Sequence, residues 1–265
     1  MTPLSWSMDH VGPMARTVLD VALALNMLVG FDSRDHSSAQ TSPEDYLAEM
    51  YGGMKGVRVG VPREFIWEIM DSQVEMAFRA ALTHMDSLGA WIQETSVPDM
   101  GLINAAGSVV QTAEAATIHR SRVLTQGERL DPVIRRRIES GLFISAEAYL
   151  HAQEVRAKLK GGLLEVLDHV DLLATPTTAI AAPGIAQERV TVSGRDVPIR
   201  EALLRITRVF STVGLPAISV PCGFTKGGLP IGLQLVARPF SESPLLQVAQ
   251  AYQESTTWHL RRPKV

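Results

Sequence analysis

Two apolar runs near the C-terminus predict a buried β-hairpin. Residues 217–220 form a short run between Pro216 and Pro221, which mark its limits because proline is tolerated at strand ends but not inside strands. Residues 231–237 form a second run that is apolar on both faces apart from Gln234, as is typical of a strand covered by helices on each side. The Thr-Lys-Gly-Gly stretch at residues 225–228 favours a tight turn between them.

Upstream of this hairpin, strand and helix patterns alternate. Residues 57–61 predict a strand that ends at Pro62, and a capping box of Ser72 and Glu75 predicts a helix over residues 73–88. Residues 91–94 predict the next strand. Strand, helix and strand in this order indicate a right-handed parallel crossover, so the sequence predicts the α/β class.

Helical periodicity accounts for much of the remaining chain. Pro13 in a first turn and Gly30 as a C-cap predict a helix between them, and Ser42 with Pro43 predicts the start of a short helix that ends near residue 50. Further helices are expected over residues 101–124, 131–139, 145–168, 199–213 and 243–252, a strand over 170–174, a loop over 175–184 and a small hairpin over 187–197. The helices lie between strands, so no domain boundary is drawn.

Composition narrows the classes of function. The 265 residues are 46% hydrophobic, which suffices for a packed core. The net charge is -3 and the arginines are scattered along the chain, so the sequence predicts no basic patch for nucleic acid and no such partner is expected. The single cysteine, Cys222, predicts a buried, unreactive thiol in a reducing compartment. No apolar run approaches the roughly twenty residues that span a bilayer, so we expect a cytoplasmic protein without a membrane partner.

Four stretches resemble the amidase signature family of serine amide hydrolases, which includes the glutamyl-tRNA amidotransferase A-subunit type. They are PLSWSMDHVGPMARTV at residues 3–18, DLLATPTT at 171–178, GLPAISVPCGF followed by GLPIGLQLVARPF at 214–240, and Trp258-His259. The resemblance covers nearly the whole chain. It implies a mixed, largely buried β-sheet covered by helices on both faces, and it implies that residues 1–265 are the C-terminal part of a single amidase domain, incomplete at its N-terminus.

Cleaving an unactivated amide requires a nucleophile, a proton shuttle and donors for the developing oxyanion. The resemblance implies that two serines and a lysine supply these through an acyl-enzyme. The family's segment rich in glycine and serine, and its lysine, are expected upstream of residue 1. We expect the five lysines of the chain to lie at the solvated surface: Lys55, Lys158, Lys160, Lys226 and Lys264. We assign three serines to packing and capping roles: Ser5, Ser7 and Ser219. We therefore expect no catalytic residue within the chain and no activity of the chain alone.

Six residues are candidate substrate contacts. The resemblance places Asp9, in the S-x-D-x-x-G-P segment at residues 7–13, close to the catalytic centre, although a carboxylate there can instead cap its own loop. Arg137 matches the helix on which family members that bind carboxylate-bearing substrates place an arginine. The other candidates form one segment: Thr207, Arg208, Phe210 and Ser211. Ser211 stands where the family usually has asparagine, which indicates either altered specificity or a structural helix end.

Motifs for other chemistries are absent from the sequence. The seven histidines show no H-E-x-x-H pattern and no paired cysteines, so no metal is expected. There is no G-x-S-x-G elbow, phosphate-binding loop or dinucleotide fingerprint, so no cofactor is expected. The expected partners are a small-molecule amide and either a second copy of the chain or an N-terminal fragment. Two alternatives stay open: a glutamine amidotransferase subunit that releases ammonia to a partner, and a non-catalytic remnant or scaffold.

Overall fold

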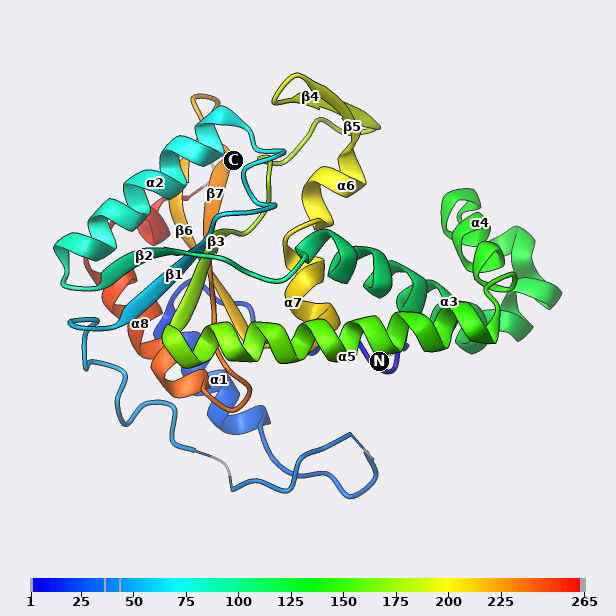
Figure 1. Cartoon of the computed structure of the whole chain (residues 1–265), viewed down its shortest axis with the longest axis horizontal. Helices are drawn as coiled ribbons and strands as arrows, with labels where there is room; N and C mark the ends of the chain where they lie inside the picture. The colour runs from blue at the N-terminus through cyan, green and yellow to red at the C-terminus, as the bar shows by residue number, and fades with distance from the viewer. Residues whose placement is uncertain (1, 36, 43, 263–265) are drawn as a thin grey trace.

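A five-stranded mixed sheet forms the centre of the computed structural model, which describes residues 2–35, 37–42 and 44–262. The strands lie in the order β2-β1-β3-β7-β6 (Figure 1). β1 is parallel to β2 and β3, whereas β7 is antiparallel to β3 and β6. The strands are β1 (Arg58–Pro62), β2 (Trp91–Thr95), β3 (Leu172–Pro176), β6 (Ala217–Phe224) and β7 (Pro230–Val236). The predicted α/β class, the parallel β1–β2 pair and the C-terminal hairpin are confirmed.

Helices flank the sheet and share one apolar core with it. The central strand β3 is buried along its whole length, while the edge strand β2 is largely exposed. Apolar side chains of six helices join the core of β1, β3 and β7: α1 (Val18–Leu28), α2 (Ser72–Ser87), α3 (Met100–Gln126), α5 (Ala146–His169), α7 (Thr207–Val213) and α8 (Glu242–Glu254). Within the described ranges, no helix has both the length and the apolarity needed to span a membrane.

A helical arm extends from the sheet on the right of Figure 1. It consists of α3 (Met100–Gln126), the short 3₁₀ helix Gly127–Arg129, α4 (Pro132–Gly141) and the N-terminal half of α5. Asp131 caps α4 and Ser145 caps α5, as the sequence predicts. Gly141 brings α4 against α3 so closely that a Cβ there would lie 2.2 Å from the carbonyl oxygen of Thr112. The arm is therefore fixed by a contact that only glycine permits.

Two predicted helix starts are wrong. α1 begins at Val18 with Thr17 as its N-cap, because the Thr17 side chain accepts a hydrogen bond from the backbone N–H of Asp20. Pro13 therefore lies in an extended segment before the helix. α2 is capped by Asp71 and not by Ser72, since Asp71 Oδ1 accepts from the N–H of Gln73 at 2.8 Å.

The predicted helix over residues 199–213 is two helices, α6 (Ile199–Leu204) and α7. The junction contains Arg205, which is buried, pairs with Glu68 at 3.2 Å and stacks on the ring of Phe65. These tertiary contacts compete with helix continuation, and no local pattern reveals them. Residues 46–50 form turns and not the predicted helix, and Pro43 lies outside the described residues.

Strand β6 does not end at Val220 as predicted. It continues through Pro221 to Phe224, with an irregular register between Pro221 and Gly223. β6 is the last strand in the sheet order, where a residue without an N–H is tolerated. The small hairpin is confirmed as β4 (Arg189–Val192) and β5 (Arg195–Pro198), with Ser193 and Gly194 at positive φ in its turn.

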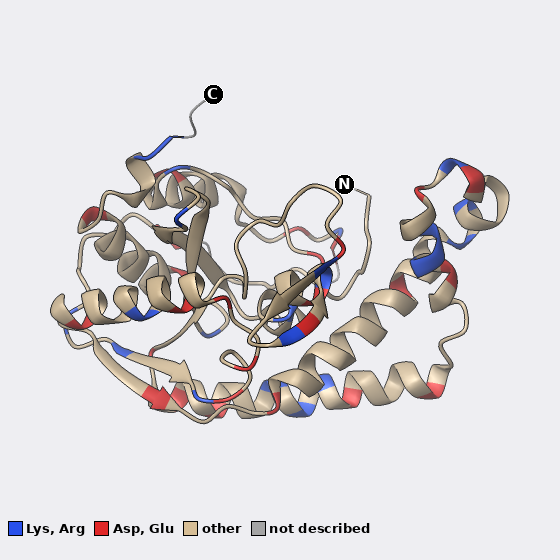
Figure 2. Cartoon of the chain, turned by 90° about the horizontal axis from the view of Figure 1, so that it is seen from above, with Lys and Arg blue, Asp and Glu red and all other residues tan. Residues whose placement is uncertain are grey.

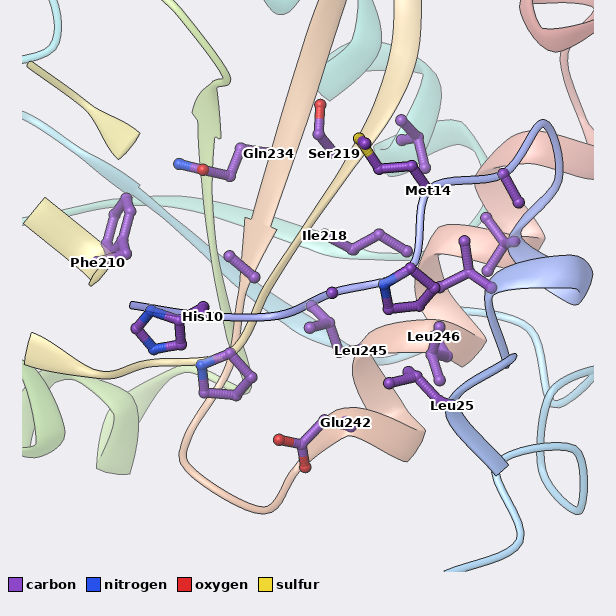
Figure 3. Close-up of a pocket in the computed structure, with 18 of the residues that line it drawn as sticks. His10, Met14, Leu25, Phe210, Ile218, Ser219, Gln234, Glu242, Leu245 and Leu246 are labelled. Atoms are coloured by element: carbon purple, nitrogen blue, oxygen red, sulfur yellow. The ribbon is translucent and has the colours of Figure 1, made fainter. Parts of the chain in front are cut away.

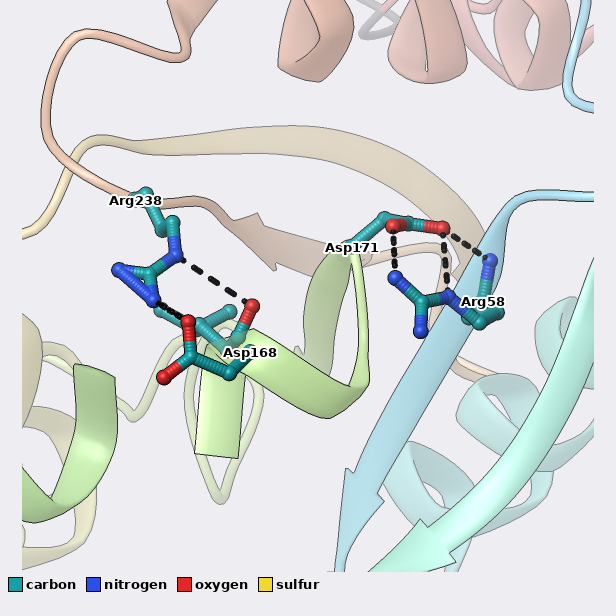
Figure 4. Close-up of polar contacts among 5 residues, drawn as sticks. Arg58, Asp168, Asp171 and Arg238 are labelled. Atoms are coloured by element: carbon teal, nitrogen blue, oxygen red, sulfur yellow. Dashed lines mark hydrogen bonds and ion pairs between the residues drawn. The ribbon is translucent and has the colours of Figure 1, made fainter. Parts of the chain in front are cut away.

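Two ion pairs lie at the ends of strands of the sheet (Figure 4). Asp171, just before β3, accepts from the N–H and the guanidinium of Arg58 on β1, each at 2.7 Å. Arg238, which follows β7, donates to the carbonyl oxygen of Leu164 at 3.0 Å and pairs with Asp168 at the end of α5. Such exposed pairs contribute about 0–1 kcal/mol each, so they fix geometry more than stability.

Candidate functional site

A cavity of about 610 Å³ lies beside β6, the edge strand of the sheet (Figure 3). The extended segment 10–17, α1, α7, the first half of β6 and α8 surround it. Three of the six candidate residues, Thr207, Phe210 and Ser211, line the cavity from α7. Apolar side chains such as Ile218, Leu245 and Leu246 form most of its wall, which is typical of a small-molecule site with few polar groups.

The extended segment 10–17 is held in place from α8. Gln253 accepts from the N–H of Val18 at 2.9 Å through Oε1 and donates to the carbonyl oxygen of Arg16 at 3.4 Å through Nε2. One buried amide side chain thus satisfies backbone groups at the start of α1. These bonds fix the cavity wall formed by segment 10–17, in which the sequence predicted a helix from Pro13 onward.

A few polar groups face the cavity. Ser219 on β6 is hydrogen-bonded to Thr177, with 2.6 Å between the hydroxyl oxygens, and Gln234 on β7 donates to Thr175 at 3.0 Å. Glu242 lies on the opposite side in Figure 3. Burial raises the pKa of Glu242, and the nearby Glu44 carboxylate adds to this rise. A carboxyl group with a raised pKa in a cavity is a candidate functional group, because it can donate a hydrogen bond as well as accept one.

A buried carboxylate anchors the polypeptide that leads into the cavity wall. Glu114 on α3 is 4% exposed. It accepts from the hydroxyls of Ser5 at 2.5 Å, Ser7 at 2.8 Å and Tyr149 at 2.9 Å, and from the N–H of Ser7 at 3.1 Å. Burial alone would raise the pKa of Glu114, but the hydrogen bonds from Ser5, Ser7 and Tyr149 lower it below its ordinary value.

Arg156 on α5 completes this anchor, which we call the Glu114 anchor and define as Ser5, Ser7, Glu114, Tyr149 and Arg156. Arg156 donates to the carbonyl oxygen of Ser7 at 2.6 Å and to its hydroxyl at 2.9 Å, and it also donates to the carbonyl oxygen of Thr212 on α7. Burial lowers the pKa of Arg156. Every charged group of the anchor therefore has polar partners within the chain.

The candidate Asp9 closes the loop that follows the anchor. Its carboxylate accepts from the backbone N–H of Leu4 at 2.7 Å, while the backbone N–H of Asp9 donates to the carbonyl oxygen of Ser5 at 2.9 Å. His10, the next residue, lines the cavity, whereas Asp9 does not. In this structure Asp9 has the geometry of a loop cap beside the cavity.

The remaining candidates, Arg137 and Arg208, belong to a second group of charges. Arg135 pairs with Glu139 at 2.6 Å, and Arg136 donates to the carbonyl oxygen of Pro132 at 3.3 Å. Burial lowers the pKa of Arg200, at the start of α6, and of Arg208 on α7, and the positive charge of Arg137 adds to both decreases. We call Arg137, Arg200 and Arg208 the arginine group. Arg200 was not identified from the sequence, since its neighbours come from other helices.

Other sequence expectations have mixed outcomes. The structure confirms the expected exposure of Lys55, Lys158 and Lys226. Lys160 is instead half-buried, because it lies on α5 beside Gly214 at the end of α7. Lys264 lies outside the described residues. Cys222 is buried, and burial raises the pKa of its thiol to about 12. Among the described residues, no three His, Cys, Asp or Glu side chains gather in a way that could hold a metal ion.

Comparison with known proteins supports the resemblance seen in the sequence. A family model described as Amidase matches residues 1–246. This chain belongs to the amidase family. It is 37% identical over 281 aligned positions to the A-subunit of a glutamyl-tRNA(Gln) amidotransferase of Chloroflexus aggregans, covering 97% of this chain and 56% of the relative. It is 35% identical over 266 positions to an amidase of Pseudomonas putida, covering 100% of this chain and 57% of the relative.

Solved structures share the fold of this amidase-family chain. One, described as the inhibitor-bound form of a vestigial protein complex that reveals the evolutionary origins of an s-triazine catabolic enzyme, has a TM-score of 0.91 at 27% identity and covers 98% of this chain and 56% of that one. The A-subunit of the glutamyl-tRNA(Gln) amidotransferase of Thermotoga maritima has a TM-score of 0.78 at 30% identity, covering 96% and 54%. The chain thus spans about half the length of the curated relatives it matches.

Proposed function

We propose that this chain is the C-terminal portion of an amidase that hydrolyses small carboxylic amides through an acyl-enzyme. The observation that carries the proposal is the cavity of about 610 Å³ at the open edge of the sheet. Its wall is largely apolar and contains a few fixed polar groups, which suits an acyl group attached to a polar amide. Thr207, Phe210 and Ser211 on α7 are the proposed substrate contacts.

The open edge of β6 supports this proposal. Among the described residues β6 pairs with β7 alone, so backbone groups along its outer edge have no strand partner. The apolar side chains of Trp6, Val11 and Met14, in the segment that leads into and along the cavity, are also exposed. We infer that polypeptide equivalent to the rest of the relatives covers this edge and supplies the serine nucleophile and the lysine base that the family resemblance implies.

The names of several relatives favour a second candidate function, that of a glutamine amidotransferase subunit. The chain is 37% and 36% identical to two proteins named as A-subunits of glutamyl-tRNA(Gln) amidotransferase. In this case ammonia released from glutamine would pass to a companion protein. The fold shared with a member of a vestigial protein complex also supports assembly with a partner. Co-purification with companion subunits would separate the two candidates.

Acyl transfer to hydroxylamine tests the proposal. We expect no transfer from simple amides by the chain alone, and transfer when the N-terminal portion of the Pseudomonas putida amidase is added, because an acyl-enzyme can be intercepted by a second nucleophile. Turnover by the chain alone that Ser5→Ala, Ser7→Ala or Ser219→Ala abolishes would overturn the proposal. Glutamine cleavage that appears only with companion subunits would favour the second candidate.

A further inference from the structure

A second cavity, of about 330 Å³, lies between α2, β6 and the C-terminal end of α8. Its wall includes His84 of α2, Cys222 of β6, Tyr252 of α8, and Trp258 of the 3₁₀ helix Trp258–Leu260. We propose that this cavity binds a small neutral aromatic molecule that carries a hydrogen-bond donor, such as a phenol. Its volume suits such a ligand, because an apolar cavity of about 150 Å³ already holds one benzene ring.

The lining of this cavity is uncharged, although Lys, Arg, Asp and Glu lie on helices across the chain (Figure 2). None of the described residues that line it belongs to these four types. Burial raises the pKa of the Cys222 thiol to about 12 and also raises that of the Tyr252 hydroxyl, so both groups stay neutral near pH 7. A charged ligand would lose hydration there without gaining an ion pair, so the cavity favours a neutral ligand.

Three rings contribute to the wall, those of His84, Tyr252 and Trp258. Tyr252 is 1% exposed, and its ring meets the His84 ring edge-on with the centroids 5.9 Å apart. The indole of Trp258 packs against the ring of Phe224 on β6, with 6.0 Å between the centroids. These rings are held by partners within the chain, so a further planar ring can pack against them in an offset or edge-to-face arrangement.

The hydrogen bonds of Ser255, which also lines the cavity, define the tautomer of neutral His84. The Ser255 hydroxyl donates to the carbonyl oxygen of Tyr252 at 2.8 Å, so its oxygen accepts from His84 Nε2, which lies 2.8 Å away. Neutral His84 therefore carries its proton on Nε2, and its Nδ1 is an acceptor. A hydrogen-bond donor on the ligand would complement this acceptor in a lining that is otherwise largely apolar.

This second cavity is separate from the cavity of about 610 Å³. No described residue lines both, although β6 and α8 contribute to each. Tyr252 lines the second cavity, whereas Gln253, the next residue of α8, lines the first and holds the segment 10–17. The inference therefore goes beyond the proposed function and does not rest on it, and equilibrium binding tests it without any turnover.

NMR titration of the purified chain with phenol, toluene and benzoate tests the site. We expect saturable binding of phenol and toluene, and at least tenfold weaker binding of benzoate because of its charge. Ala80, an exposed residue of α2, lies at the rim of the cavity, so Ala80→Phe should fill the space and weaken phenol and toluene binding at least tenfold. His84→Phe keeps a ring but removes the acceptor, so it should weaken phenol binding about fivefold and leave toluene binding unchanged.

Thr83→Phe is the matched control, because Thr83 is exposed on the same helix as Ala80 but does not line the cavity. It should bind phenol as the unchanged chain does, and thermal melts check that each variant is folded. Equal phenol affinity in Ala80→Phe and the unchanged chain, an equal loss in Thr83→Phe, or benzoate binding as tight as that of phenol would overturn the proposal. Equal losses of phenol and toluene in His84→Phe would contradict the hydrogen bond to Nδ1. Failure of the amidase proposal would appear in the hydroxylamine experiment and would leave these titrations unaffected.

Discussion

The Glu114 anchor and the arginine group are two sets of polar residues on the helices of this structure. The anchor contains groups of opposite charge, Glu114 and Arg156, whereas the arginine group contains positive charges alone. In the anchor, the Glu114 carboxylate accepts four hydrogen bonds and Arg156 donates to the Ser7 hydroxyl and to two carbonyl oxygens. In the arginine group, Arg200 and Arg208 sense the charge of Arg137 but have no described carboxylate to pair with.

We expect this difference in charge to distinguish residues that stabilise the fold from residues that bind a ligand. A buried charge with all of its partners inside the chain stabilises one conformation, and removing it leaves those partners unsatisfied. The arginine group has no ion pair with a described carboxylate, and two of its members, Arg137 and Arg208, are candidate substrate contacts. The anchor is therefore expected to matter for stability and the arginine group for binding.

The largest effect is expected for Glu114→Ala. It leaves Ser5, Ser7 and Tyr149 without their acceptor and Arg156 without the nearby negative charge, so the free energy of unfolding should fall by about 3–5 kcal/mol. Denaturant unfolding measures this change. Glu154→Ala, at an exposed site on α5, is the control and should cost less than about 0.5 kcal/mol. Similar costs for the two variants would remove the distinction between anchor and surface.

Gly141→Ala tests the close contact between α4 and α3. A Cβ at this position would clash with the carbonyl oxygen of Thr112 and with Ala116, so stability should fall by about 1–3 kcal/mol. Gly161→Ala, on α5, meets no atom within 4 Å and serves as the control. Equal stability of Gly141→Ala and Gly161→Ala would show that the close approach of α4 to α3 does not require glycine.

Glu114→Gln gives a smaller effect with a defined pH dependence. Because the folded-state pKa of Glu114 is lowered from 4.5, its charge contributes stability above the unfolded pKa, and this contribution is lost as pH falls through the folded value. The difference in unfolding free energy between the unchanged chain and Glu114→Gln should be constant above about pH 5.5, a unit above the unfolded pKa, and shrink below pH 4.5. A difference that does not change down to pH 3 would contradict the assigned role of the Glu114 charge.

The smallest effect on stability is expected for Arg200→Met. Removing one of three like charges at the surface should change the free energy of unfolding by no more than about 0.5 kcal/mol, in the stabilising direction. The gain should decline as salt is added, because salt screens the repulsion that Arg200 experiences. Thermal melts at low and high salt measure it. A loss above 1 kcal/mol would show that Arg200 has a structural partner.

Local patterns were enough to predict much of the fold. The hairpin of β6 and β7, the parallel pair of β1 and β2, and the caps at Asp131 and Ser145 depend on residues close in sequence, and all are confirmed. The helix start at Pro13 failed because a tertiary contact from Gln253 helps to fix the preceding segment as extended. The break between α6 and α7 depends on the contact of Arg205 with Glu68, which no short-range pattern reveals.

The candidate site likewise contains residues that the sequence identified and residues that it did not. Thr207, Phe210 and Ser211 were found together because they lie in one short segment that the family resemblance covers, and all three line the cavity. Glu114 was missed, because a glutamate in an alanine-rich helix resembles a solvated residue and its serine partners lie more than a hundred residues away in sequence. Arg200 was missed because its lowered pKa arises from burial and from the charges of Arg137 and Arg208, which lie on other helices. Contacts between distant segments were thus beyond what the sequence could show.

The central claim is that the cavity edge of β6 is completed by the remainder of an amidase. Hydrogen exchange of the chain, alone and mixed with the N-terminal portion of the Pseudomonas putida amidase, tests it most directly, since the opposite sheet edge β2 provides an internal control. We expect amides of residues 217–220 and of the segment 10–17 to become protected on mixing, while residues 91–95 remain unchanged. Protection that appears at β2 instead, or no change at either edge, would contradict the claim.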